Sequence, residues 1–175
     1  MKRIIPLLML LALLPVGVFA LDFYAGANAY YASLIQPADV QAIDTANLNM
    51  ADFSFGGEAR IVGHLLWASA IGTYTPADVN MPHRLDIMLD GGVGLTLGIV
   101  RAGIGIGPNF GIEMGDNAGN YFKTGANMRL TGDVLLGPFS VGLSWINKIE
   151  FTRASFVEAF ENPYGQLGLA VLYKL

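Results

Sequence analysis

Residues 100–114 read VRAGIGIGPNFGIEM, and every second residue of this stretch is apolar. The even positions hold valine, alanine, isoleucine, proline, phenylalanine and methionine, whereas the odd positions hold arginine, asparagine, glutamate and glycine. A period of two places successive side chains on opposite faces of a β-strand. A strand of this length with one apolar face is typical of a transmembrane β-barrel, in which the apolar side chains face lipid and the others face the lumen.

The same alternation recurs along the chain and predicts eight strands. They lie near residues 22–34, 52–63, 65–74, 83–96, 99–114, 122–136, 139–149 and 164–175. The third is the least regular, because Leu65, Leu66 and Trp67 interrupt its alternation. Long connections, over residues 35–51, 75–82, 115–121 and 150–163, alternate with short turns near residues 63–64, 97–98 and 137–138. Outer-membrane barrels have short periplasmic turns and longer external loops. The predicted fold class is therefore all-β, an up-and-down antiparallel transmembrane β-barrel of eight strands.

The N-terminal residues have the layout of a secretory signal peptide. A basic pair, an apolar run and small residues before a cleavage site follow one another, namely Lys2 and Arg3, residues 4–14, and Val18 and Ala20. We predict a signal peptide over residues 1–20 and a single outer-membrane barrel domain over residues 21–175. The alternative is an uncleaved membrane anchor, for which the apolar run is short. The chain has no cysteine, which excludes disulfides and an acylated N-terminal cysteine.

Composition supports the same class. Hydrophobic residues make up 53% of the chain, yet the best candidate for a membrane helix after the signal, residues 91–108, is rich in glycine and contains Arg101. Without residues 1–20 the chain keeps 8 of its 10 basic and all 14 acidic residues, a net charge of −6. This charge argues against a nucleic-acid partner. The alternative fold is a soluble β-sandwich, in which the apolar faces pack together as a core.

Most of the charge falls on the inward-facing positions of the predicted strands. The predicted lumen charge network consists of Glu58, Arg60, Arg84, Asp86, Asp90, Arg101, Glu113, Lys123, Arg129, Asp133 and Lys148, with Lys174 near the C-terminus. Buried charges must pair or contact water. These side chains therefore either fill and close a narrow barrel or line a water-filled conduit. Counting outward from the turns places Glu113 opposite both Arg84 and Lys123, which predicts one cluster at the outer mouth.

Other candidates for chemistry are sparse. The glycine-rich residues 103–107 resemble a dinucleotide-binding turn, but Pro108 and continued alternation follow where that motif needs a helix. We expect no cofactor, and we expect these glycines to leave room for long neighbouring side chains. His64 and His83 are predicted at opposite ends of the barrel, so no metal site is expected. His83 has no serine beside it in the sequence and only Asp78 nearby as a carboxylate, so no catalytic residue is expected.

The predicted external loops are acidic. They contain one basic residue, Arg153, and seven acidic residues, namely Asp39, Asp44, Asp78, Asp116, Glu150, Glu158 and Glu161. Such a surface is solvated, and it also suits divalent ions that bridge anionic headgroups, or a basic partner. Residues 151–160 have the spacing of a short amphipathic segment at a membrane surface. Aromatic residues near the strand ends, Trp67 among them, are assigned to interfacial girdles.

The last predicted strand ends in LGLAVLYKL, with Leu167, Leu169, Val171, Tyr173 and Leu175 on one face. With the signal peptide and the eight-strand pattern, this ending resembles the small outer-membrane β-barrels of double-membraned bacteria, the group of the outer-membrane protein A transmembrane domain and outer-membrane protein W. The resemblance implies that these five residues form a C-terminal signal read by the barrel-assembly machinery, with Leu175 in place of the usual terminal aromatic. It also implies location in the cell outer membrane, among outer-membrane lipids, after passage with periplasmic chaperones.

The predicted function is accordingly structural or interactive and not enzymatic. We expect a narrow lumen plugged by charged side chains and acidic external loops whose ligand the sequence does not name. A narrow channel or transporter for small or hydrophobic solutes is the first alternative. An enzyme that modifies lipids of the outer leaflet is the second.

Overall fold

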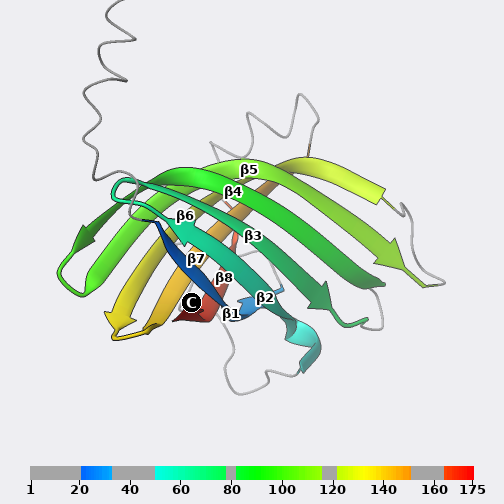
Figure 1. Cartoon of the computed structure of the whole chain (residues 1–175). Helices are drawn as coiled ribbons and strands as arrows, with labels where there is room; N and C mark the ends of the chain where they lie inside the picture. Colours follow the sequence, from blue (N-terminus) through cyan, green and yellow to red (C-terminus); the bar gives the residue numbers. More distant parts are fainter. Residues whose placement is uncertain (1–20, 33–49, 78–81, 116–121, 151–163) are drawn as a thin grey trace, which may run out of the picture.

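The computed structural model describes residues 21–32, 50–77, 82–115, 122–150 and 164–175. The predicted signal peptide and most of each long connection lie outside these ranges. The described chain forms a closed antiparallel barrel in which every strand pairs with its neighbours in sequence and β8 pairs with β1 (Figure 1). The strands are β1 (Asp22–Tyr31), β2 (Phe53–Val62), β3 (Leu66–Thr75), β4 (His83–Leu97), β5 (Val100–Met114), β6 (Phe122–Leu136), β7 (Phe139–Glu150) and β8 (Gln166–Lys174), and a short 3-10 helix, η3 (Met50–Asp52), precedes β2.

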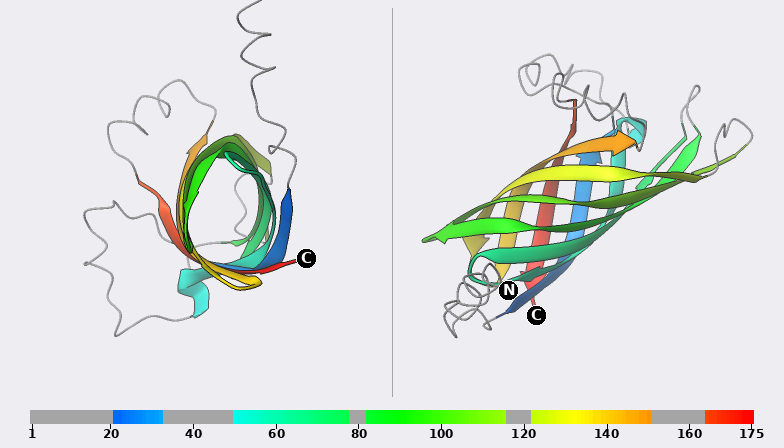
Figure 2. Two further views of the ribbon diagram at one scale, coloured as in Figure 1. Left: turned by 60° about the vertical axis from the view of Figure 1, so that its left-hand side comes forward. Right: turned by 90° about the horizontal axis from the view of Figure 1, so that it is seen from above.

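The predicted strands are confirmed, with boundaries that differ by three residues at most. The view along the barrel axis in Figure 2 shows one ring of strands around one interior. In β5, Ile104 and Ile106 are 46% and 60% exposed, whereas Arg101 on the other face is buried. The apolar positions of the alternation thus form the outer surface, and the polar positions form the lumen, as the period of two requires.

The two ends of the barrel differ. One end, the turn end, carries the connections β2–β3, β4–β5 and β6–β7, the start of β1 and the end of β8 (Figure 2). The opposite end, the loop end, is where the strands lead into the four longer connections. No helix in the described residues is long and apolar enough to cross a membrane.

Two of the turns are two-residue hairpins with glycine first. Leu97 pairs with Val100 and Leu136 with Phe139, which leaves Gly98-Ile99 and Gly137-Pro138 as the loops. Gly98 and Gly137 have φ angles of 61° and 63°. A positive φ at the first central position followed by a negative φ at the second, here Ile99 or Pro138, gives the type II′ geometry that suits the twist of a hairpin. These turns fix the register of β4–β5 and β6–β7.

The third turn places Trp67 inside the barrel. Val62 pairs with Trp67 across a four-residue loop, within which the Gly63 amide donates to the Leu66 carbonyl at 2.7 Å. Paired residues share a face, and Val62 faces the lumen, so Trp67 is buried at 5% exposure. The assignment of Trp67 to an interfacial girdle is therefore wrong. Leu65 and Leu66 precede Trp67 as an apolar run without alternation, so the sequence does not show which residue of β3 is the first to face the lumen.

Candidate functional site: the charged interior

The interior carries the side chains that the alternation assigned to the lumen. They come from β2 (Glu58, Arg60), β4 (Arg84, Asp86, Asp90), β5 (Arg101, Glu113), β6 (Lys123, Arg129, Asp133) and β7 (Lys148). The structure divides them into a cluster at the middle of the barrel, pairs near the loop end, and one arginine near the turn end. This division follows from the position of each residue within its strand, because that position sets how far the residue lies from either end of the barrel.

The central cluster consists of Glu58, Arg60, Asp90, Arg129 and Asp133. Arg129 donates from Nη1 and Nη2 to the two Glu58 oxygens at 2.9 Å each, and Nη1 lies 3.5 Å from Asp90 Oδ2. Arg60 donates from Nε to Glu58 at 2.7 Å and from Nη1 to Asp133 at 2.6 Å. These five side chains are exposed by 2% at most. Charges so deeply buried are tolerated because each has an opposite charge and hydrogen bonds.

Further polar side chains add hydrogen bonds to this cluster. Ser69 accepts from Arg129 Nη1 at 3.1 Å and lies 3.4 Å from Asp90 Oδ2. Asn127 donates its side-chain amide to Asp90. β2, β3, β4 and β6 are thereby joined across the lumen.

Trp67 covers the central cluster on the side of the turn end. The Cζ atoms of Arg60 and Arg129 lie 5.9 and 5.6 Å from the centroid of its ring, within the range of cation–π attraction. The indole donates from Nε1 to the Val93 carbonyl at 3.1 Å. A Cβ on Gly105 would stand 2.6 Å from the indole. The glycines of β5 thus make room for a long side chain, as predicted, and that side chain is Trp67.

Two apolar layers enclose the central cluster. Toward the turn end lie Tyr24, Val62, Trp67, Ala170 and Leu172. Toward the loop end lie Tyr30, Ile71, Met88 and Ile146. The large apolar side chains of these layers are hard to find from the sequence, because an apolar residue at an inner position looks like a break in the alternation.

Near the loop end the charges form two groups. Asp86 binds Arg84 at 2.9 Å and Lys148 at 3.1 Å, and Lys123 binds Glu113 at 2.7 Å. Arg84 is paired with Glu113 in the β4–β5 register, which confirms that prediction, although its salt bridge goes to Asp86. Lys123 stands opposite Gly111, two residues from the predicted position. The predicted direct opposition of Lys123 and Glu113 is wrong, and the long lysine side chain reaches its partner diagonally.

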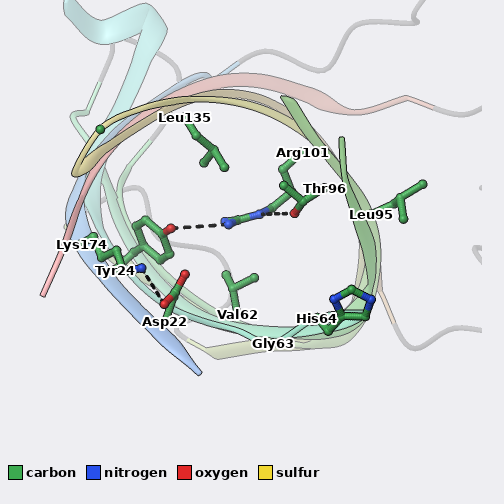
Figure 3. A pocket seen from close by; sticks show the side chains of 11 residues that line it. Asp22, Tyr24, Val62, Gly63, His64, Leu95, Thr96, Arg101, Leu135 and Lys174 are labelled. Atoms are coloured by element: carbon green, nitrogen blue, oxygen red, sulfur yellow. Dashed lines mark hydrogen bonds and ion pairs between the residues drawn. The ribbon is translucent and has the colours of Figure 1, made fainter. Parts of the chain in front are cut away.

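The turn end opens into a cavity of about 380 Å³. Figure 3 shows Arg101 extending across it from β5 toward Tyr24 of β1, with His64 and the Asp22–Lys174 pair at the margin. Arg101 donates to Thr96 Oγ1 at 3.3 Å and to the Tyr24 hydroxyl at 3.4 Å. Lys174 Nζ lies 2.7 Å from Asp22 Oδ1. This pair ties the last strand to the first at the closing seam.

The two histidines lie at opposite ends. His64 is in the β2–β3 turn, and His83 begins β4 at the loop end. His83 Nδ1 accepts the hydroxyl of Tyr74 at 2.5 Å and the amide of Ala77 at 3.1 Å. Within the described ranges no group of three potential metal ligands occurs.

The C-terminal strand presents the residues of the predicted assembly signal on the outer face. Leu169, Val171 and Tyr173 are exposed, and the ring of Tyr173 packs edge-on against Phe139 at 5.3 Å between centroids. The acidic external loops and the segment 151–160 fall outside the described residues, apart from Glu150 at the end of β7.

Among solved structures, the crystal structure of the N-terminal β-barrel domain of Pseudomonas aeruginosa OprF is similar to this chain. The two share 12% sequence identity, with a TM-score of 0.61, over 89% of this chain and 97% of that chain. At this identity the likeness establishes the fold, a small eight-stranded barrel of the outer-membrane type. No family model matches the sequence. Comparison with curated proteins also finds no match.

Proposed function

We propose that the protein is an integral outer-membrane barrel with a structural and interaction role, closed to solutes by its own interior. The observation that carries this proposal is the central cluster, whose charged side chains are almost completely buried and joined to one another across the lumen. A closed barrel surrounded by lipid leaves the loops as the surface that meets partners. The acidic residues predicted in those loops suit divalent cations or a basic partner.

The outer surface supports insertion in a membrane. Large apolar side chains are exposed on all eight strands, which a soluble protein of this size would not present to water. Aromatic pairs lie near both ends, Phe139 with Tyr173 at the turn end and Tyr31 with Phe53 at the loop end. Rings at these levels suit the two membrane interfaces. In the orientation of known outer-membrane barrels, the turn end faces the periplasm.

The cavities within the barrel mouths support closure. The turn-end cavity of about 380 Å³ and a loop-end cavity of about 110 Å³ are lined by different residues. No residue of the central cluster lines either of them. A solute would therefore have to displace the cluster, which means separating several buried ion pairs at once.

A narrow, gated channel is the second candidate, and one observation favours it. Both side-chain polar atoms of Asn28 and the hydroxyl of Thr73 are buried inside the barrel, and no other described residue forms a hydrogen bond with them. Buried polar groups that lack a protein partner are usually hydrogen-bonded to ordered water, so these positions suit water molecules inside the lumen. The enzymatic alternative has no such support in the described residues, where the His83 bonds above go to a tyrosine and a backbone amide.

Conductance in planar lipid bilayers separates the two candidates. The purified full chain is expected to show little or no steady current. Arg129→Ala removes the side chain that joins β6 to β2 and β4, and it is expected to give frequent openings. Asp22→Asn, which alters only the half-exposed pair at the turn end, serves as the control and is expected to behave like the parent. A large steady current from the parent would overturn the closed barrel and establish the channel.

A further inference from the structure

Within the described part of the chain, one cation inside the barrel has no acidic partner. Each of the five inner carboxylates forms a salt bridge with a base other than Arg101. Glu58, Asp90 and Asp133 bind the arginines of the central cluster, and Asp86 and Glu113 bind the bases near the loop end. Among the described residues Arg101 forms none. Apart from the Asp22–Lys174 pair, the described part of the interior holds six basic and five acidic side chains, and the base without a salt bridge lies at the turn end.

Arg101 is also incompletely hydrogen-bonded. Its residue is 6% exposed, and its buried Nη1 atom has no hydrogen-bond partner in the ranges that the structure describes. The two bonds it makes go to neutral hydroxyls at 3.3 and 3.4 Å, which are long for a guanidinium. Its Cζ lies 5.2 Å from the centroid of the Tyr24 ring. These contacts hold the side chain in place but supply no negative charge, so a buried arginine retains its capacity for one anionic partner.

The cross-strand neighbour of Arg101 on β6 is an acid that forms its salt bridge with a different arginine. Asp133 stands directly opposite Arg101 in the β5–β6 register, where unlike charges normally pair. Its carboxylate instead lies 2.6 Å from Arg60, and its other oxygen accepts from Thr131 at 3.4 Å. Asp133 thus belongs to the central cluster and forms no salt bridge with Arg101, although the two residues stand opposite each other in the register.

The space beside Arg101 suits an anion that enters from the turn end. Arg101 lines the cavity of about 380 Å³ together with Lys174, His64 and Thr96, and Asp22 is the acid of that lining (Figure 3). Asp22 is already bound to Lys174. Val62 and Leu135 complete the wall and exclude part of the water, which strengthens an ionic contact.

We propose that this cavity is a binding site for one small oxyanion group, a carboxylate or a phosphate, held by Arg101 with Thr96 and Lys174 beside it. Binding requires the guanidinium to turn its Nη atoms into the cavity in exchange for the long bond to Tyr24. The fork of an arginine binds two oxygens of such a group at once, whereas chloride offers a single centre. The site does not depend on whether the barrel conducts.

The test is a titration of the full chain, labelled with nitrogen-15, in an uncharged detergent. Acetate and inorganic phosphate are added separately against chloride at constant ionic strength, and the Arg101 Nε–H and Thr96 amide signals are followed by NMR. At least one of the two anions is expected to give a saturable shift. Arg101→Gln is expected to abolish it, and Arg101→Lys to weaken it about tenfold or more because the fork is lost. Arg84→Gln, at the loop end, is the matched control and is expected to keep the parent's affinity.

A second measurement keeps the proposal testable if Arg101→Gln does not fold. An anion that binds the folded state raises the unfolding temperature of the parent in a saturable way, and Arg101→Lys should lose most of that increase. NMR shifts that grow linearly with the concentration of both anions, without saturation, would overturn the proposed site. So would equal binding by Arg101→Lys and the parent, or a response of Arg101 to anionic lipid alone.

Discussion

The guanidinium of Arg129 meets the carboxylate of Glu58 through two parallel hydrogen bonds of 2.9 Å, and both side chains are completely buried. This two-pronged contact joins β6 to β2, strands that are not neighbours in the barrel wall. Such pairs combine strength with a fixed geometry. The contact therefore holds β2 and β6 together across the lumen.

Glu58→Gln should destabilise the barrel strongly. The change leaves Arg60 with Asp133 and Arg129 with only the 3.5 Å contact to Asp90, so Arg129 loses its closest carboxylate while its guanidinium stays buried. Breaking a buried ion pair from one side costs about 3–5 kcal/mol. Urea unfolding in lipid vesicles, followed by tryptophan fluorescence, measures the difference. Asp22→Asn at the exposed pair is the control and should have a much smaller effect. Equal losses of unfolding free energy in both variants would contradict a stabilising role of the Arg129–Glu58 contact.

Gly105→Ala should disturb the packing of Trp67. The new methyl group would stand 2.6 Å from the indole, so either the ring or the strand must move. Overpacking of this kind costs about 1–3 kcal/mol. The control is Gly91→Ala in β4, where no atom lies within 4 Å of an added Cβ. In the double variant Trp67→Leu/Gly105→Ala the penalty of the alanine should largely disappear. If the two changes are simply additive, Trp67 and Gly105 do not compete for space.

The strands and their faces are predictable from the sequence because the alternation is local. The short turn between β4 and β5 is equally local, and counting outward from it places Arg84 opposite Glu113, as the register has it. The register across residues 115–121 is not predictable in this way, because a longer connection does not fix its own centre. Lys123 is consequently displaced by two residues from its predicted partner.

The central cluster is predictable in membership but not in pairing. Contacts such as Arg129–Glu58 and Arg60–Asp133 cross the lumen, and they depend on how the closed barrel brings β2 against β6. Cross-strand reasoning alone would assign Asp133 to Arg101. The side of Trp67 is hidden for a related reason, because it depends on the length of the β2–β3 turn, and the apolar run Leu65-Leu66-Trp67 does not show where that turn ends.

Ile106→Arg should destabilise the protein in lipid. Ile106 lies near the middle of β5, on the outer face, and is 60% exposed, so its arginine would meet the hydrocarbon. An arginine near the bilayer midplane costs about 2–4 kcal/mol, and this falls toward zero near the interfaces. Ile99→Arg, in the turn between β4 and β5, is equally exposed but lies at the end of the barrel. Reversible unfolding in vesicles should give a clearly lower free energy of unfolding for Ile106→Arg than for Ile99→Arg. The opposite ranking would refute the lipid-facing assignment.

The orientation of the barrel can be tested with single cysteines, because the chain contains none of its own. In the proposed orientation, Asn47→Cys and Asn117→Cys lie in external connections, and Ile99→Cys lies at the periplasmic turn end. A membrane-impermeant maleimide applied to intact cells should therefore label the first two and spare the third. After the outer membrane is permeabilised, Ile99→Cys should react as well, since this residue is 62% exposed, and this control shows that its thiol is accessible. Rapid labelling of Ile99→Cys on intact cells, with protection of the other two, would invert the topology and move the Arg101 cavity to the outside.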